Sequence, residues 1–451
     1  MVKRLIIPLI LLFTCCFRHN DALYIFFSSP WHNLSPYGTP LPPEYQARFT
    51  LYEPLVWVKV NGYIPALAKS WVTIDDTTWV FHLVTNAVFH DGTRFTAGDV
   101  VYSFKNYMEK NPDEKRNFYI KSIVPLDSFT VKFILHRNNP LFLPMVSSVP
   151  IVSKTLEGTG PYFLYSAKTD TIILKRFRGY RNPVPFEYQY IISIGDAEKR
   201  VEALSGVNYG VAFRINPGIN MDKLPGGLNT RRVKTYALKY IAFSNPGRLE
   251  KEIRHIIYYA TRKLDFTPSG EMIYQFVPLL SNFYSPVIED SLENLCKKAS
   301  IKPLKKPVTL SLVHWITIKN EGEMIKNALE PYNINTKLIS VNNIEEWMKK
   351  IKQADMFIIT VFFDPNDIVG VWLNVFEEFV NSKRIRNYLK GVKPESFIEL
   401  KKNSDRIQWM LFEEMPLIPL YNRVETMVYT NNISFETFPE QFIPFYSIKK
   451  K

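Results

Sequence analysis

The residues that most suggest chemistry are His90 and Asp91, an adjacent pair of two residue types found in catalytic triads. Neighbouring residues in a turn do not point at one another, and no motif places a serine or cysteine nucleophile beside them. The Gly158-Thr159-Gly160 run lacks the glycine spacing and the lysine of a phosphate-binding loop. The seven histidines include no close pair at metal-ligand spacing. These residues therefore indicate no catalytic or phosphate-binding site, and we expect neither a cofactor nor a metal.

The N-terminus has the pattern of an export signal. A basic pair at residues 3–4 precedes an apolar run at residues 5–13, which is too short to span a bilayer. We therefore predict a signal peptide over residues 1–16. Cys15 and Cys16 follow the apolar run directly, and this junction is similar to the site at which bacterial lipoproteins are cut and lipidated. We predict lipidation at one of the two cysteines; an ordinary signal peptide is the alternative.

The rest of the composition places few limits on the partner. Cys296 is the only other cysteine, so no disulfide joins parts of the folded body, and we expect a small buried residue on a helix. The formal net charge is +13. The charges are dispersed apart from Lys449-Lys450-Lys451, which we expect to be a solvated tail. Nucleic-acid binding would require a basic stripe interleaved with exposed aromatics, and export argues against it.

Residues 89–104 predict a strand–turn–helix unit. Asp91-Gly92 is a turn signal, because glycine accepts positive φ without steric cost. Thr96 followed three residues later by Asp99 resembles a helix capping box, with aspartate in place of the usual glutamate or glutamine. Apolar residues then follow at helical spacing.

The two halves of the chain differ in their predicted elements. Before residue 244 the strong signals are strands, at residues 24–27, 79–83, 129–135, 172–174 and 236–243. Beyond residue 250, helices alternate with strands, which indicates an α/β lobe with a mainly parallel sheet. The predicted helices cover residues 253–264, 292–299, 324–329, 344–351 and 407–411, and the predicted strands cover residues 308–313, 336–341 and 356–362. Residues 416–421 return to extended chain.

Residues Phe89–Phe104 also closely resemble a signature of bacterial ABC-transporter solute-binding proteins of the peptide/nickel family, family 5. Further landmarks follow in family order over roughly residues 24–440, among them Tyr52–Val56, Gly158–Tyr162, Ala197–Arg200 and Met415–Tyr421. The chain is therefore identified as a member of that family. Thr261 stands where the family usually has aspartate, and this departure bears on the ligand class and not on the fold.

The resemblance implies an α/β, two-lobed periplasmic-binding-protein fold of the Venus-flytrap type. Lobe one would comprise residues 24–240 and 422–451, with an extra β-rich subdomain at about residues 46–155. Lobe two would comprise residues 241–421. The ligand would bind between the lobes and be buried as they close.

The resemblance also implies ligand contacts in the second lobe. In peptide-binding members an aspartate of this lobe pairs with the α-ammonium of the ligand. Asp364 occupies that position, and Asp367 is the alternative alignment; either residue could instead cap a turn or helix. Tyr421 aligns with aromatics that line the cleft, the alternative being a core tyrosine with a satisfied hydroxyl. Trp372 could wall a side-chain pocket, the alternative being a buried helix residue.

In the first lobe, Trp31 and His32 follow the first strand, where the family's loop reaches the ligand. The alternative for both is a packed surface loop beside Pro30.

The implied function is the extracytoplasmic substrate-binding component of an ABC importer, which captures short peptides and delivers them to a permease in the inner membrane. We expect a monomer at the periplasmic or extracellular face of the membrane, held there by the lipid anchor. One alternative keeps the fold and binds a nickel chelate, haem, a sugar or an opine. Another is a surface interaction protein without a role in transport, and an enzyme using Cys296 or His90 ranks last.

Overall fold

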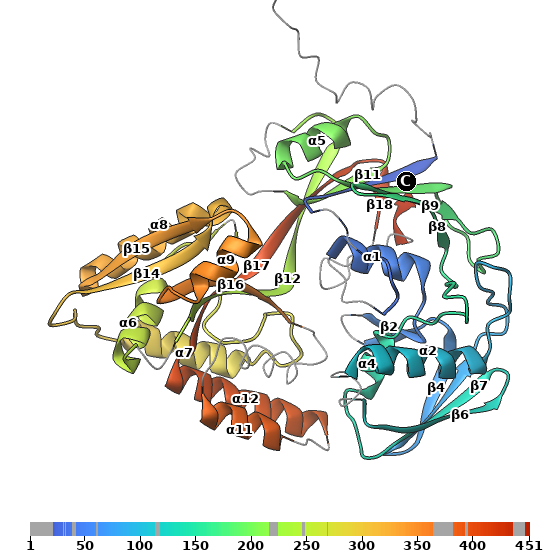
Figure 1. Cartoon of the computed structure of the whole chain (residues 1–451), viewed down its shortest axis with the longest axis horizontal. Coiled ribbons are helices and arrows are strands. Elements are labelled where there is room, and N and C mark those ends of the chain that lie inside the picture. Colours follow the sequence, from blue (N-terminus) through green and yellow to red (C-terminus); the bar gives the residue numbers. More distant parts are fainter. Residues whose placement is uncertain are drawn as a thin grey trace, which may run out of the picture. The chain divides into compact units, whose positions relative to one another are not determined.

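The computed structural model describes residues 21–29, 31, 33–37, 42–59, 62–112, 118–215, 224–245, 249–267, 269–363, 382–392, 396–435 and 447–451 (Figure 1). The chain divides into two units. Unit 1 comprises residues 1–138, 142–233 and 426–451, and unit 2 comprises residues 139–141 and 234–425. The chain crosses between them within two long strands, β12 (Leu228–Phe243) and β17 (Leu417–Thr430).

The central sheet of unit 1 has the strand order β17-β11-β1-β10-β9-β8. Its strands are β1 (Ala22–Phe27), β8 (Tyr162–Lys168), β9 (Thr171–Arg176), β10 (Tyr188–Ser193), β11 (Gly210–Ile215) and the end of β17. β1 is buried on both faces and runs parallel to β10 and β11. Leu23, Ile25 and Phe27 pack in one core with helix α1 (Pro42–Leu51), while Phe26 packs in another with α5 (Ala197–Ser205). The strand alternation therefore places one helix on each face.

A second sheet in unit 1 has the order β4-β5-β7-β6 and is antiparallel throughout. Its strands are β4 (Ala68–Asp75), β5 (Thr78–Leu83), β6 (Ile120–Asp127) and β7 (Thr130–Leu135). Helix α2 (Ala97–Lys110) packs on it, with the rings of Phe104 and Phe133 4.9 Å apart. The predicted capping box of α2 is confirmed, since the Asp99 carboxylate accepts from both the amide and the hydroxyl of Thr96.

The other described elements of unit 1 are the hairpin of β2 (Val56–Lys59) with β3 (Gly62–Pro65), helix α4 (Phe142–Ser147), and the pair of β18 (Ile433–Ser434) with β19 (Lys449–Lys450).

The segment Gly158–Gly160 lies against the end of α1. The Gly160 amide donates to the Leu51 carbonyl at 2.9 Å, and the His90 amide donates to the Gly158 carbonyl at 2.9 Å. A Cβ atom on Gly158 would lie 2.0 Å from the Leu51 carbonyl oxygen. Only glycine therefore fits here without moving the backbone.

Gly158→Ala is expected to lower the free energy of unfolding by about 2 kcal/mol, because the added methyl group overpacks a fixed backbone contact. Gly226→Ala is the matched control, since a Cβ atom there meets nothing within 4 Å. The thermal midpoints of the two variants test this. Equal midpoints would contradict the prediction, because they would show that residues 158–160 can shift to accommodate the methyl group.

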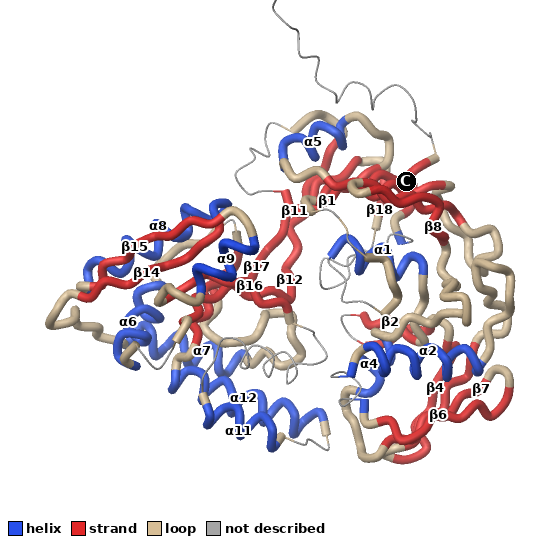
Figure 2. The backbone as a smooth tube through the Cα atoms, viewed as in Figure 1, coloured by secondary structure: helices blue, strands red, loops and turns tan. Residues whose placement is uncertain are grey.

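The sheet of unit 2 has the order β15-β14-β16-β12-β17, and β13 (Gly270–Met272) also pairs with β17 (Figure 2). The remaining strands are β14 (Val308–Trp315), β15 (Ile334–Val341) and β16 (Met356–Phe362). The expected parallel pairing holds for β14 with β15 and with β16. β12, however, is antiparallel to β16. β12 also begins at Leu228, earlier than the predicted start at residue 236. The prediction missed the first half of the strand because those residues are largely exposed and lack an apolar pattern.

Helices cover this sheet. They are α6 (Lys251–Thr261), α7 (Pro286–Lys298), α8 (Lys319–Leu329), α9 (Ile344–Ile351), α11 (Lys383–Gly391) and α12 (Phe397–Glu414), with short 3-10 turns at Ile316–Ile318 and Glu330–Tyr332. One apolar core includes residues of α6, α8, α11 and α12 with β12 and β16. Trp347 and Ile351 of α9 pack in a separate core against Phe357 of β16.

Candidate ligand-binding site

The crossing strands β12 and β17 are fastened to one another in unit 2 by side-chain hydrogen bonds. The Thr235 hydroxyl donates to the Arg423 carbonyl at 2.8 Å, and the Asn422 amide nitrogen donates to the Thr235 carbonyl at 2.9 Å. Asn422 is fully buried, and its side-chain oxygen accepts from the Leu279 amide at 2.7 Å. These contacts fix the register of the two strands from which any cleft residue on β17 would project.

The chain leaves β16 beside the same strands. The amide of Phe363 donates to the Tyr236 carbonyl of β12 at 2.8 Å, and the Phe363 ring lies 6.5 Å from that of Tyr240. Phe362 is 53% exposed although it ends a buried strand. Asp364, Asp367 and Trp372 lie outside the described residues, so their predicted contacts stay predictions. Strand β16, which precedes Asp364, pairs with β12, and β12 is the neighbour of β17 in the sheet.

Tyr421 of β17 has the environment of the core alternative. It is 2% exposed, its ring packs on Phe266, and its hydroxyl donates to the Glu321 carboxylate at 2.8 Å. Burial and the nearby Glu321 raise the pKa of Tyr421 far above its usual range. The side chain is therefore a donor committed within unit 2, and its contact with a ligand stays a prediction.

A buried group of charges around Tyr421 is absent from the sequence-based prediction. Lys239 of β12 is 9% exposed, and burial lowers its pKa to about 8 while Glu321 opposes that shift. Arg423 contacts Glu425 at 3.1 Å. The sequence signal that could have revealed these buried charges is Lys239, a single lysine inside the apolar run 236–243, where an unbalanced charge is costly. This charged cluster joins β12, β17 and α8.

The predicted first-lobe residues lie at the end of β1. The Trp31 indole nitrogen donates to the Lys168 carbonyl of β8 at 2.6 Å, and its ring packs at the edge of the unit 1 core. This environment resembles the packed-loop alternative, and a contact of Trp31 with a ligand stays a prediction. His32 lies outside the described residues.

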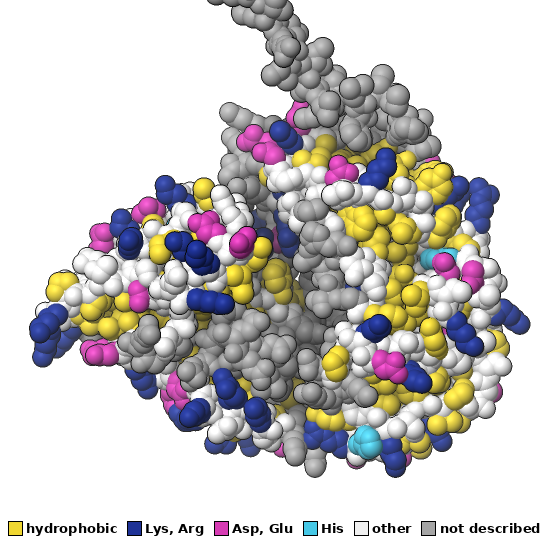
Figure 3. Space-filling model, viewed as in Figure 1, with side chains coloured by type: hydrophobic (Ala, Val, Ile, Leu, Met, Phe, Trp, Pro, Cys, Tyr) yellow, Lys and Arg dark blue, Asp and Glu magenta, His cyan; other side chains and the backbone are white. Residues whose placement is uncertain are grey.

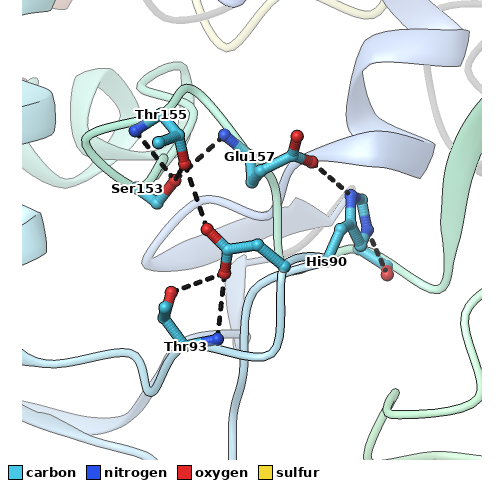
Figure 4. A network of polar contacts seen from close by, with 7 residues as sticks. His90, Thr93, Ser153, Thr155 and Glu157 are labelled. Carbon is cyan, nitrogen blue, oxygen red and sulfur yellow. Dashed lines mark hydrogen bonds and ion pairs between the residues drawn. The ribbon is translucent and has the colours of Figure 1, made fainter.

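His90 and Asp91 form part of a polar network that holds residues 153–160 in place (Figure 4). Asp91 accepts from the amide and hydroxyl of Thr93 and from the hydroxyl of Thr155 at 3.0 Å. His90 instead contacts the Gly160 carbonyl through Nε2 at 3.0 Å, and its Nδ1 lies 3.7 Å from Glu157. His90 and Asp91 thus bind different partners, and both hold the local fold in place.

Burial lowers the pKa of His90 from 6.5 to about 4. The unfolded chain therefore takes up a proton at this residue before the folded chain does as the pH falls. Stability is expected to drop by about 3 kcal/mol between pH 6.5 and pH 4, with no contribution from His90 above that range. Urea midpoints at pH 7.5 and pH 4.5 test this. His90→Gln should lose that part of the pH dependence, and parallel curves for both proteins would contradict the assignment.

Glu53 anchors a second buried network in unit 1. Its carboxylate accepts two hydrogen bonds of 2.7 Å from the Arg181 guanidinium, and others from Tyr180 at 3.2 Å and Thr159 at 3.1 Å. The side chains of Glu53 and Arg181 are 2% and 10% exposed. The pair links the end of α1 to the loop after β9, and it belongs to the framework of the unit.

The cysteines give no sign of chemistry in the described part of the chain. Cys296 lies on α7, half-buried at the edge of the unit 2 core. Burial raises the pKa of its thiol to about 11, so the thiol is protonated at neutral pH. Cys15 and Cys16 lie outside the described residues. No group of three metal-ligating side chains occurs among the residues that the structure describes.

The sequence profile of the bacterial extracellular solute-binding proteins, family 5 (middle region) matches residues 62–379. The chain belongs to this family, whose members serve as solute-binding proteins of ABC importers. Its α/β architecture is that of the two-lobed periplasmic binding proteins. Within the described residues, no helix is long and apolar enough to cross a membrane.

Three relatives illustrate the range of this similarity. The periplasmic oligopeptide-binding protein OppA of Salmonella typhimurium is 36% identical over 80 residues, which are 18% of this chain but only 15% of OppA. The nickel-binding protein NikA of Staphylococcus aureus is 27% identical over 398 residues, covering 80% of this chain and 78% of NikA. The structure of DppA from Helicobacter pylori in complex with the peptide STSA has a TM-score of 0.72 at 18% identity, covering 95% and 98% of the two chains.

Proposed function

We propose that this protein is the extracytoplasmic substrate-binding component of an ABC importer, which captures short peptides and presents them to a membrane permease. The observation that carries the proposal is the family match over residues 62–379, which includes the end of β16 and the segment that follows it. Capture requires that the ligand contact both units in the closed state, since otherwise it cannot shift the equilibrium toward closure. We further propose a monomer, tethered by a lipid on Cys15 or Cys16.

The place of Asp364 in the sequence, just after β16, supports the proposal that the ligand carries a free α-ammonium group. Asp364 directly follows the buried residue Phe363 in the sequence, and the Phe363 amide donates to the Tyr236 carbonyl of β12. A carboxylate held in a shielded cleft pairs strongly with an ammonium group, and backbone edges bind the peptide chain as an added strand. The similarity to OppA and DppA points to the same ligand class.

A tripeptide and its N-acetylated form test this ligand class directly in isothermal titration calorimetry. Acetylation removes the ammonium charge and leaves the peptide otherwise intact. The free tripeptide is expected to bind at least 100-fold more tightly, because the acetylated form would leave the carboxylate of the protein buried without a counter-charge. Equal affinity for both forms would refute the ammonium pairing.

A nickel chelate is the second candidate, and the extent of the NikA similarity favours it. A chelate carries its own ligands to the metal, so the protein needs few metal-binding side chains of its own. Binding of nickel with L-histidine, without binding of tripeptides, would select this candidate.

We also propose that the protein has no catalytic activity of its own. The described residues most suited to catalysis support this: His90 is engaged with Gly160, and the Cys296 thiol is held protonated. Turnover that is lost in His90→Gln or Cys296→Ala would contradict the proposal.

A further inference from the structure

Lys239 is a buried cation in the sheet of unit 2. It lies on β12, between β16 and β17, and only 9% of the residue is exposed. Within the described part of the chain, its ammonium group has no hydrogen-bond or ion-pair partner. A buried charge without a partner costs free energy, and a bound anion would offset that cost.

The charged groups that face Lys239 come from α8 and β17. Glu321 of α8 attracts Lys239 without forming an ion pair with it, and its carboxylate accepts from the Tyr421 hydroxyl at 2.8 Å. Glu321 also lies in the first turn of α8, where the helix dipole stabilises negative charge. Arg423 of β17 repels Lys239 and pairs with Glu425 at 3.1 Å. Among the described residues of this cluster, Lys239 is thus a cation without a counter-ion.

The face of the sheet that carries Lys239 opens toward the end of β16. Lys239 is in register with Thr360, and Ala237 is in register with Phe362. Residues two apart on a strand point to the same side, so Thr360 and Phe362 lie on the face of Lys239. On this face the exposed fraction along β16 rises from 1% at Ile358 to 53% at Phe362. The approach to Lys239 therefore lies on the side of Thr360 and Phe362.

The same end of β16 leads to Asp364, the residue proposed above to bind the ammonium group of the ligand. Asp364 follows Thr360 by four positions, a chain length that spans at most about 14 Å. The two charged ends of an extended tripeptide are about 10 Å apart. A short peptide whose ammonium is bound by Asp364 therefore has the length to bring its carboxylate near Lys239.

We propose that Lys239 binds a carboxylate group of the captured ligand, and that Thr360 and Phe362 line the approach to it on unit 2. The ligand class is then narrowed to peptides with a free carboxylate, either at the C-terminus or on an acidic side chain. Hydrogen bonds between charged groups are roughly twice as strong as those between neutral ones, so this contact would contribute much of the affinity. The inference rests on the proposed capture of short peptides and deepens it.

Isothermal titration with three peptides tests the carboxylate contact. Trialanine is expected to bind at least about 30-fold more tightly than trialanine amide, because the amide leaves the Lys239 ammonium buried without a counter-ion. If these two bind equally but alanyl-glutamyl-alanine amide binds more tightly, the carboxylate is that of an acidic side chain. Equal affinity for all three would overturn the inference and leave peptide capture intact. Failure of all three to bind would refute peptide capture itself, and this inference with it.

Lys239→Met tests the residue directly. Methionine keeps the apolar stem and removes the charge, so the carboxylate-bearing peptide should lose at least about 30-fold in affinity, and trialanine amide should change by about threefold at most. Lys239→Arg should recover part of the lost affinity. An equal loss for both peptides would assign the effect to the fold of β12 and overturn the proposal. The three-peptide comparison needs no variant, so it decides the matter even where Lys239→Met is unstable.

Lys337→Met is the matched control. Lys337 is an exposed lysine on β15 of the same unit, and Figure 3 shows basic side chains scattered over the region where Figure 1 places β14 and β15. Its replacement removes the same charge and should leave the affinity for trialanine within about twofold. A loss as large as that in Lys239→Met would attribute binding to overall charge and overturn the proposal. Thermal midpoints measured on the same samples show that the variants are folded.

Discussion

Replacement of Asp364 by alanine is expected to weaken tripeptide binding about 100-fold or more while leaving the thermal midpoint unchanged. Truncating one partner of a shielded charge pair costs about 3 kcal/mol, because the ligand ammonium would then be desolvated without a counter-charge. The chain leaves β16 at Phe363, which is tied to Tyr236, so removal of the next side chain should not disturb the strand. Isothermal titration with a free tripeptide measures the effect.

Asp367→Ala is the matched control for this prediction, because it removes the same charge three residues further along. It should change the affinity by about threefold at most. If Asp367→Ala lost binding and Asp364→Ala did not, the alternative alignment would be correct. If both variants bound tripeptide normally, the ammonium would be held by another group of the protein.

Arg181→Ala is expected to lower the free energy of unfolding by about 3 to 5 kcal/mol. The substitution leaves the Glu53 carboxylate buried without its cation, and the desolvation cost of that charge is no longer offset. Tyr180 and Thr159 donate to the same carboxylate and compensate only part of this loss. Urea denaturation followed by tryptophan fluorescence gives the change in stability.

Arg178→Ala provides the comparison, because Arg178 is an exposed arginine in the same loop. Its effect should stay within about 0.5 kcal/mol. Arg181→Lys should fall between the two, since lysine keeps the charge but loses the two-pronged geometry. Equal midpoints for Arg181→Ala and Arg178→Ala would show that the Glu53 network is not part of the framework.

Much of the fold followed from local patterns in the sequence. Thr96 and Asp99 marked the start of α2, because a capping pair depends on residues three apart and needs no tertiary context. β16 was predicted at its observed bounds because a mostly buried strand is a nearly continuous apolar run. The first half of β12 was missed, since exposed strand residues carry no apolar signal and are fixed by partners distant in the sequence.

The site was less accessible to sequence reasoning. Tyr421 occupies a family landmark, yet its hydroxyl is bound to Glu321, a hundred residues earlier, and only tertiary structure reveals that contact. The burial of Lys239 follows from the packing of β12, and the sequence shows only a lysine in an apolar run. Similarly, the ion pair of Lys450 with Asp21 could not be predicted, because Asp21 lies near the other end of the chain.

Native mass spectrometry of residues 17–451, purified without refolding, tests the central claim most directly. A peptide receptor is expected to carry a spread of added masses that match short peptides, and these should disappear in Asp364→Ala. A single added mass matching a nickel chelate would contradict the peptide assignment and favour the second candidate. Protein that carries no added mass and takes up neither a tripeptide library nor nickel with L-histidine would contradict solute capture itself.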